Sequence, residues 1–191
     1  LMLEINSDLS WRDVQDVLIR SASRNDPENI GWTVNAAGLA FHHNYGFGMV
    51  NANAAVRQAE LHVPLVPKTS ITVIGELNIL DIPDNDDVGI QVMFEVADAL
   101  QVEHVQVQLD IVHTYRGDLR IELMSPSNTV SVLMTPSRSI SAENYDNWVF
   151  TTVASWGESS LNRWQLRIFD VYPQDVGSLY SADLIVHGTP Y

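Results

Sequence analysis

The spacing of apolar residues changes near residue 61, and before this point it is helical. Ser10 is followed three residues later by Asp13, and this spacing is typical of a capping box, in which a helix N-cap residue pairs with an acidic residue in the first turn. Apolar residues then recur at helical spacing, at Val14, Val17, Leu18 and Ala22. This pattern predicts a helix over about residues 10 to 23.

A second helix and a linker follow in the same part of the chain. Asn51 can cap the stretch NANAAVRQAEL, which predicts a helix over about residues 51 to 60. Residues 62–70, HVPLVPKTS, hold two prolines and no helical pattern, so they are expected to form an extended and fairly stiff linker. These features divide the chain into a helical part over residues 1–61, the linker, and a third part over residues 71–191.

The third part has a period of two. Eight segments alternate apolar and polar residues or are rich in β-branched and aromatic residues: ITVIGELNIL, IQVMFEVA, VEHVQVQLDIV, LRIELMS, VSVLM, WVFTTV, RWQLRIFD and ADLIVHG. Clusters of turn-forming residues separate them, and no helix is needed between them. The pattern predicts a mainly β protein, with an eight-stranded antiparallel sandwich and a jelly roll as its leading form.

Composition and charge narrow the classes of partner. The 191 residues are 46% hydrophobic and 18% charged, which is typical of a folded globular chain. The formal net charge of -14 argues against a nucleic-acid partner, because phosphate contacts need clustered Lys and Arg. It suits divalent cations or basic partners, or it serves solubility alone. The chain has no cysteine, so disulfides and thiol chemistry are excluded, and no apolar run is long enough to span a membrane.

The chain does not show a self-contained hydrolase triad. Ser, His and Asp are all present, but there is no GxSxG motif to set a nucleophile on a sharp turn. Ser125 and Ser127 flank Pro126, which predicts a hairpin turn. Adjacent His42 and His43 have no HExxH pattern or third ligand near them, so a zinc site is not expected.

The sequence RGD, residues 116–118, allows two interpretations. As an adhesion motif it is only three residues long, and it recurs by chance. As a structural turn, Gly117 permits a tight bend and Asp118 accepts hydrogen bonds from nearby backbone donors before the next strand. We expect the structural turn.

The acidic stretch DIPDNDDVG, residues 81–89, is the best candidate for a metal site, with Asp84, Asp86 and Asp87 as possible Ca²⁺ ligands. Asp84, Asp86 and Gly89 even match three EF-hand positions. However, the fifth position is Val88, and the following residues alternate like a strand, so an EF-hand is rejected. A looser Ca²⁺ site shared with other loops and a solvated polar turn both remain open.

Longer stretches of the chain resemble a known family. LMLEINSDLSWRDVQDVLIRSA and the run ending in HHNYGFGMVNANAAV resemble the C-terminal end of the catalytic domain in kexin- and furin-like subtilases. HTYRGDLRIELMSPSNTVSVLM, NWVFTTVASWGESSLNRWQLRIFD and GSLYSADLIVHGT are similar to the P domain that follows it. The resemblance assigns residues 1–61 to a remnant of the subtilisin-like α/β domain and residues 71–191 to the P domain.

The resemblance implies a Ca²⁺-dependent serine endopeptidase that cleaves after basic residues. In that family the P domain is an eight-stranded jelly roll that packs on the catalytic domain and supports its folding. The catalytic Ser lies on a GTS motif that would come before Leu1, so no residue of this chain is assigned as catalytic. The implied partners are the upstream catalytic domain and protein substrates, and the implied location is secreted, periplasmic or at the cell surface. The absence of cysteine favours a bacterial member.

A second hypothesis is a free-standing β-sandwich that binds carbohydrate or a surface partner, with exposed Trp side chains and an acidic Ca²⁺ site. Residues 1–60 argue against it, because such a module has no reason to begin with the end of a subtilase domain.

Overall fold

The computed structural model describes residues 1–75 and 78–191 and divides into two compact units, Leu1–Lys68 and Thr69–Tyr191. The boundary falls inside the segment that the sequence assigns to a linker. The units are described separately below.

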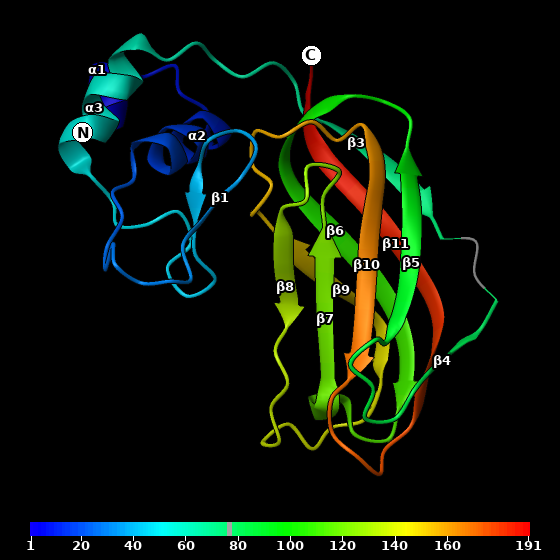
Figure 1. Ribbon diagram of the computed structural model, residues 1–191. Helices are drawn as coiled ribbons and strands as arrows, with labels where there is room; N and C mark the ends of the chain where they lie inside the picture. Colours follow the sequence, from blue (N-terminus) through cyan, green and yellow to red (C-terminus); the bar gives the residue numbers. More distant parts are fainter. Residues whose placement is uncertain (76–77) are drawn as a thin grey trace. The chain divides into compact units, whose positions relative to one another are not determined.

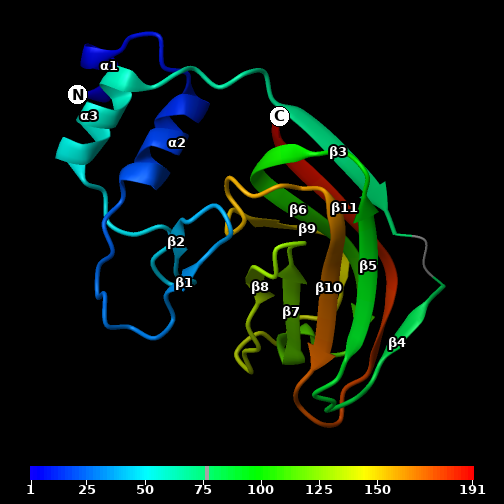
Figure 2. The ribbon, with the colours of Figure 1, turned by 45° about the horizontal axis from the view of Figure 1, so that its top comes forward.

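The first unit is built on short helices. Its elements are α1 (Met2–Ile5), α2 (Trp11–Ser21), the paired strands β1 (Thr33–Val34) and β2 (Ala40–Phe41), and α3 (Ala52–Leu61). Ser10 and Asp13 form a reciprocal capping box at the start of α2, and the Asn51 side chain accepts a hydrogen bond from Ala54 N at 3.0 Å at the start of α3. Both helices therefore begin where the sequence predicts them. Figure 2 shows α2 and α3 side by side, and their small core consists of Leu9, Val17, Ala55 and Ala59.

Asp13 also ties the following extended segment to α2. Its Oδ1 lies 2.9 Å from His62 Nε2 and accepts a hydrogen bond of 2.7 Å from Leu65 N. Burial opposes ionisation of this carboxyl, but the hydrogen bonds from Ser10, Leu65 and His62 outweigh it and hold the pKa of Asp13 well below its usual range. The first half of the proline-containing segment is therefore fixed to the helix.

The second unit consists of antiparallel strands in two sheets (Figure 1). The strands are β3 (Thr69–Ile74), β4 (Leu80–Ile82), β5 (Ile90–Val96), β6 (Leu100–His113), β7 (Leu119–Met124), β8 (Val130–Met134), β9 (Tyr145–Thr152), β10 (Asn162–Asp170) and β11 (Gly177–Pro190). One sheet has the order β5-β10-β7-β8, the other has the order β3-β11-β6-β9, and β4 pairs with β11. The antiparallel β-sandwich predicted from the sequence is confirmed.

The inward faces of the two sheets share one hydrophobic core. From Val105 to Ile111 of β6, alternate residues are buried while those between them are only partly covered, as the period of two requires. The core joins both sheets through Val105, Val107, Leu109 and Ile111 of β6 and Ile121, Leu166 and Ile168 of the facing sheet. Trp156 and Trp164 are almost completely buried. They contribute packing, and they are not available to bind a sugar.

The strand count differs from the expectation of eight. The predicted strand ITVIGELNIL includes residues 76–77, which lie outside the described residues, and its flanking parts form two strands, β3 and β4. β3 pairs with Asp183–Gly188 of β11, while β4 pairs with Gly177–Leu179 of the same strand. The long strand β11 thus pairs with two shorter strands. The alternation of apolar and polar residues in the sequence cannot show such a division. The described residues of this unit contain nine strands.

Candidate functional site

Ionisable residues from distant parts of the sequence meet at one end of the sandwich. His113 is the last residue of β6 and Asp170 the last residue of β10, and the two are completely shielded from solvent. His113 Nδ1 accepts a hydrogen bond from Tyr115 N at 3.1 Å, so the proton of the neutral ring is on Nε2. Nε2 therefore donates to Asp170 Oδ2 at 3.1 Å.

Burial dominates the electrostatics of Asp170. Removal from water raises its pKa, and hydrogen bonds from Tyr172 N and His113 oppose the rise, while the nearby negative charge of Asp84 adds to it. The His113–Asp170 pair is closed to solvent, and its buried hydrogen bond connects the ends of β6 and β10.

Asp118 lies beside this pair, at the end of the 3₁₀ turn η1 (Arg116–Asp118) between β6 and β7. The residue is only 4% exposed. Burial raises its pKa, as do the negative charges of Asp170 and Asp175, against the lowering effect of His113 and Arg138. Asp118 is thus a buried carboxyl in a negative environment.

The expected role of Asp118 as a hydrogen-bond acceptor for the turn is wrong. Among the described residues, no donor forms a hydrogen bond with its carboxylate. The turn itself is present, but it is held by backbone bonds such as Ser137 N to Gly117 O at 2.7 Å. A Cβ at Gly117 would lie 2.4 Å from Ile140 O, so this position needs glycine because another segment approaches closely. The Asp118 carboxylate instead lines a pocket.

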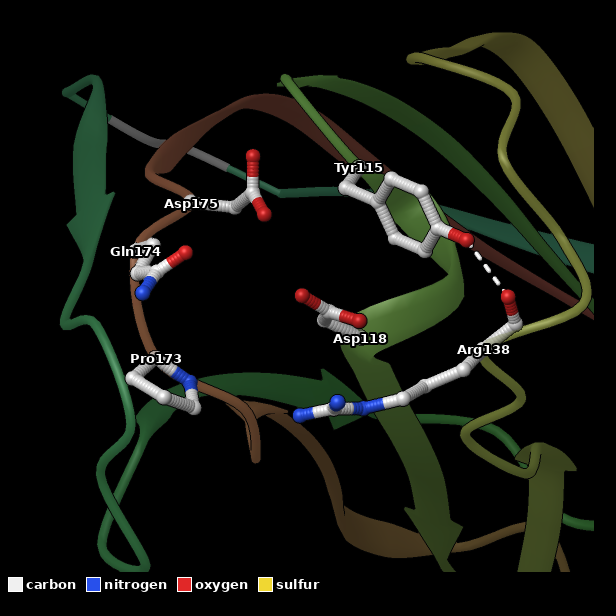
Figure 3. A pocket seen from close by; sticks show the side chains of 6 residues that line it. All are labelled: Tyr115, Asp118, Arg138, Pro173, Gln174 and Asp175. Carbon is white, nitrogen blue, oxygen red and sulfur yellow. Dashed lines mark hydrogen bonds between the residues drawn. The ribbon is translucent and has the colours of Figure 1, made fainter.

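The pocket has a volume of about 320 Å³ (Figure 3). Its lining residues come from the turn before β7, the β8–β9 connection and the β10–β11 loop: Tyr115, Asp118, Arg138, Pro173, Gln174 and Asp175. Tyr115 Oη donates to Arg138 O at 2.5 Å, and the Arg138 guanidinium lies 4.3 Å from the centre of the Tyr172 ring. Asp175 Oδ1 accepts a hydrogen bond of 2.7 Å from Thr114 Oγ1. These contacts fix the walls around the two carboxylates.

The first two of the predicted Ca²⁺ ligands hold loops in place. Both carboxylate oxygens of Asp84 accept hydrogen bonds from Gln174 N, at 3.1 and 3.2 Å, which anchors the β10–β11 loop. Asp86 Oδ1 accepts from Val88 N and Gly89 N, at 2.5 and 3.0 Å. Asp86 therefore shapes the turn before β5.

The third, Asp87, borders a separate pocket of about 240 Å³. That pocket also contains Glu122, which is paired with Arg120 and Arg167. Within residues 1–75 and 78–191, no three His, Cys, Asp or Glu side chains are grouped in a way that could hold a metal ion. Ca²⁺ binding by Asp84, Asp86 and Asp87 stays a prediction.

Other residues singled out in the sequence have structural partners. Ser125 Oγ donates to Glu158 Oε2 at 2.7 Å in a buried site, and the Ser125–Asn128 backbone turn joins β7 to β8 as predicted. His42 contacts Asn29 Oδ1 at 3.0 Å and stacks on Tyr45. In the part of the chain that the structure describes, no helix has both the length and the apolar character to cross a membrane.

The sequence did not predict the group formed by His113, Asp118, Asp170 and Asp175. A signal was present, because each of these residues lies in or beside a turn cluster next to a strand segment. Which ends of an antiparallel sandwich meet depends on strand order, however, and the sequence pattern does not give that order.

Comparison with solved structures defines the class of protein. The crystal structure of the Aeromonas sobria serine protease in complex with the chaperone ORF2 matches with a TM-score of 0.91 and 26% identity, over 100% of this chain and 42% of that chain. The structure of the serine protease of Aeromonas sobria matches with a TM-score of 0.89 over 98% of this chain. The chain therefore has the fold of a β-sandwich region, with its preceding helical unit, from a serine protease.

Sequence comparison gives the family. The profile of the proprotein convertase P-domain matches residues 102–186. By its β-sandwich unit, the chain belongs to the kexin- and furin-like proprotein convertase P-domain family. The PC3-like endoprotease variant B of Hydra vulgaris is 36% identical over 96% of this chain and 27% of its own length. The human proprotein convertase subtilisin/kexin type 6 is 34% identical over 99% of this chain and 21% of its own length. The chain thus spans about a quarter of these relatives.

Proposed function

We propose that this chain is the C-terminal part of a subtilisin/kexin-like serine endopeptidase, in which the P domain supports the folding and activity of an upstream catalytic domain. The observation that carries the proposal is the extent of the similarity. The match to the Aeromonas sobria protease covers both units, including the helical residues that a free-standing sandwich would not need.

The surface of the first unit supports a catalytic-domain partner. Large apolar side chains are exposed on it, among them Trp11, Ile30 and Met49. Its own buried core has only four residues, Leu9, Val17, Ala55 and Ala59. Exposed apolar residues in such number around so small a core are typical of a surface that another protein part covers.

Hydroxyl-radical footprinting tests this partner. In the longer protein that we propose, Trp11 and Met49 should be oxidised several-fold more slowly than in the isolated chain, because the catalytic domain covers them. Met93, which is exposed on β5 of the other unit, serves as the reference for dose. Equal oxidation of Trp11 and Met49 in both proteins would refute a covering domain at this surface.

We further propose that the isolated chain is inactive as a peptidase. The Ser125 hydroxyl is hydrogen-bonded to Glu158, and the imidazole of His113 is sealed against Asp170, so neither is available to a substrate. Fluorogenic peptides with Arg or Lys before the scissile bond should not be cleaved faster than in buffer. Cleavage that co-purifies with the chain and is blocked by a serine-directed inhibitor would contradict this.

We assign the Ca²⁺ dependence of the proposed enzyme to its upstream part. Asp84 and Asp86 accept hydrogen bonds from different backbone amides, and Asp87 lines a separate pocket. The melting temperature of this chain should therefore be the same in Ca²⁺ and in EGTA. A melting temperature several degrees higher in Ca²⁺ than in EGTA would show that these loops bind Ca²⁺ after all.

We infer a jelly-roll connectivity for the sandwich. With the short β4 left aside, the eight remaining strands lie in the orders β3-β11-β6-β9 and β5-β10-β7-β8. Consecutive strands lie in opposite sheets except for the β7–β8 hairpin, and this is the arrangement of two interleaved Greek keys. We also propose secretion or a periplasmic or cell-surface location, supported by the kexin- and furin-like relatives. Fractionation of producing cells tests the location, and a purely cytosolic protein would contradict it.

A further inference from the structure

The pocket at the His113–Asp170 end of the sandwich contains a charged group without a partner. Asp118 is 4% exposed, and among the described residues neither a hydrogen bond nor an ion pair reaches its carboxylate. Figure 3 shows this carboxylate directed into the cavity, with that of Asp175 on the opposite wall. A buried carboxylate of this kind is costly unless a donor or cation meets it.

The net charge of the pocket is negative. Asp118 and Asp175 contribute two carboxylates, and Arg138 contributes one guanidinium. In the described structure no ion pair joins Arg138 to either carboxylate, and its guanidinium lies over the Tyr172 ring instead. Asp170 adds negative charge from behind the pocket. The complementary ligand is therefore a cation.

The size and walls of the pocket favour an organic cation over a metal ion. Ca²⁺ needs about six to eight oxygen ligands at roughly 2.3–2.6 Å, which calls for converging carboxylates. The cavity of about 320 Å³ is much larger than such a site, and Tyr115 and Pro173 supply apolar walls. A guanidinium group suits these features, because it pairs with carboxylates through two parallel hydrogen bonds and packs its flat face on rings.

We propose that this pocket binds the guanidinium group of an arginine side chain from a peptide or protein partner, with Asp118 as the buried acceptor and Asp175 as the acceptor at the rim. The proposal does not depend on the protease assignment, since it rests on the β-sandwich unit alone.

Nuclear magnetic resonance titration of the 191-residue chain tests the proposal. The probe is Nα-acetyl-arginine amide, and the matched control is Nα-acetyl-citrulline amide, which has the same shape without the charge. We expect saturable shifts at the backbone amides of Tyr115, Asp118 and Gln174 with the arginine probe. The citrulline compound should bind at least tenfold more weakly.

Variants assign the binding to the carboxylates. Asp118→Asn should weaken binding of the arginine probe at least tenfold, while Asp146→Asn, which changes an exposed carboxylate on β9, should leave it unchanged. If Asp118→Asn does not fold, Asp175→Asn serves as the test, and it should weaken binding of the arginine probe at least threefold.

Three results would overturn the proposal. The first is an equal response to the citrulline compound. The second is undiminished binding by the folded Asp118→Asn variant, or by Asp175→Asn where Asp118→Asn does not fold. The third is a titration with CaCl₂ that shifts the same amides and displaces the arginine probe, which would assign the pocket to a metal ion.

Discussion

At the scale of single residues, the buried carboxyl groups differ in how well hydrogen-bond donors offset the cost of burying their charge. Asp13 is surrounded by donors, and its pKa is lowered. Asp118 and Asp170 lie among other acids, and burial raises the pKa of each. Of these last two acids, as far as the described residues show, Asp170 alone is met by a donor side chain, His113. The molecule therefore carries stabilising and destabilising ionisations at once, and their pH dependences have opposite signs.

The raised pKa of Asp118 predicts the effect of Asp118→Asn on stability. Between the unfolded value of about 3.9 and the raised native value, the native state binds more protons than the unfolded state, so this contribution to stability is lost as pH rises. The variant has no such loss. Urea unfolding from pH 4 to 8 should show the stability of Asp118→Asn, relative to wild type, increasing as pH rises.

The control for this prediction is Asp146→Asn, whose carboxylate is exposed. The pH-dependent gain in stability should be larger in Asp118→Asn than in this control. A difference between Asp118→Asn and wild type that stays flat, or that falls with rising pH, would show that Asp118 does not titrate as described.

At the scale of elements, polar side chains fix where helices and loops begin and what they hold. Asp13 completes the capping box that Ser10 begins at the start of α2, and it also accepts hydrogen bonds from His62 and Leu65. Asp84 anchors the β10–β11 loop through Gln174 N. In both cases one carboxylate joins segments far apart in the sequence.

Removal of the Asp13 carboxylate should release the segment that follows α3. In Asp13→Ala, the Leu65 amide should exchange with solvent at least tenfold faster, and the helix cap alone should cost about 1 kcal/mol. Because the pKa of Asp13 is lowered in the folded state, its contribution is present above about pH 3.9 and is lost as pH falls. Hydrogen exchange at pH 7 measures the effect.

Asp8→Ala is the matched control for this experiment, since Asp8 is an exposed acid just before the same helix. It should leave exchange at Leu65 unchanged. Slow exchange of Leu65 in Asp13→Ala would mean that the extended segment is held by other contacts.

The sequence predicted those elements whose signals are local. The caps Ser10 and Asn51, and the alternation along β6 and β10, depend on neighbouring residues and were interpreted correctly. The division into β3 and β4 and the free carboxylate of Asp118 depend on partners far along the chain. Pattern analysis cannot find such features, because strand order and close approach arise only in the folded molecule.

At the scale of the whole molecule, two units with different surfaces share one chain. The first unit exposes apolar residues around a small core, while the second has a large shared core between two sheets. The net charge of -14 adds a long-range attraction for basic peptides. The exposed apolar residues of the first unit are those that the proposed catalytic domain would cover.

The central claim is that this region stabilises a catalytic domain, and the most direct test is removal of the β-sandwich. Thermal unfolding and peptide cleavage would be measured on the longer protease with and without residues 69–191. We expect the shortened enzyme to melt at least 10 °C lower, or to fail to accumulate in folded form, and to lose most of its cleavage of basic peptides. An enzyme that keeps its melting temperature and its activity without these residues would contradict the account.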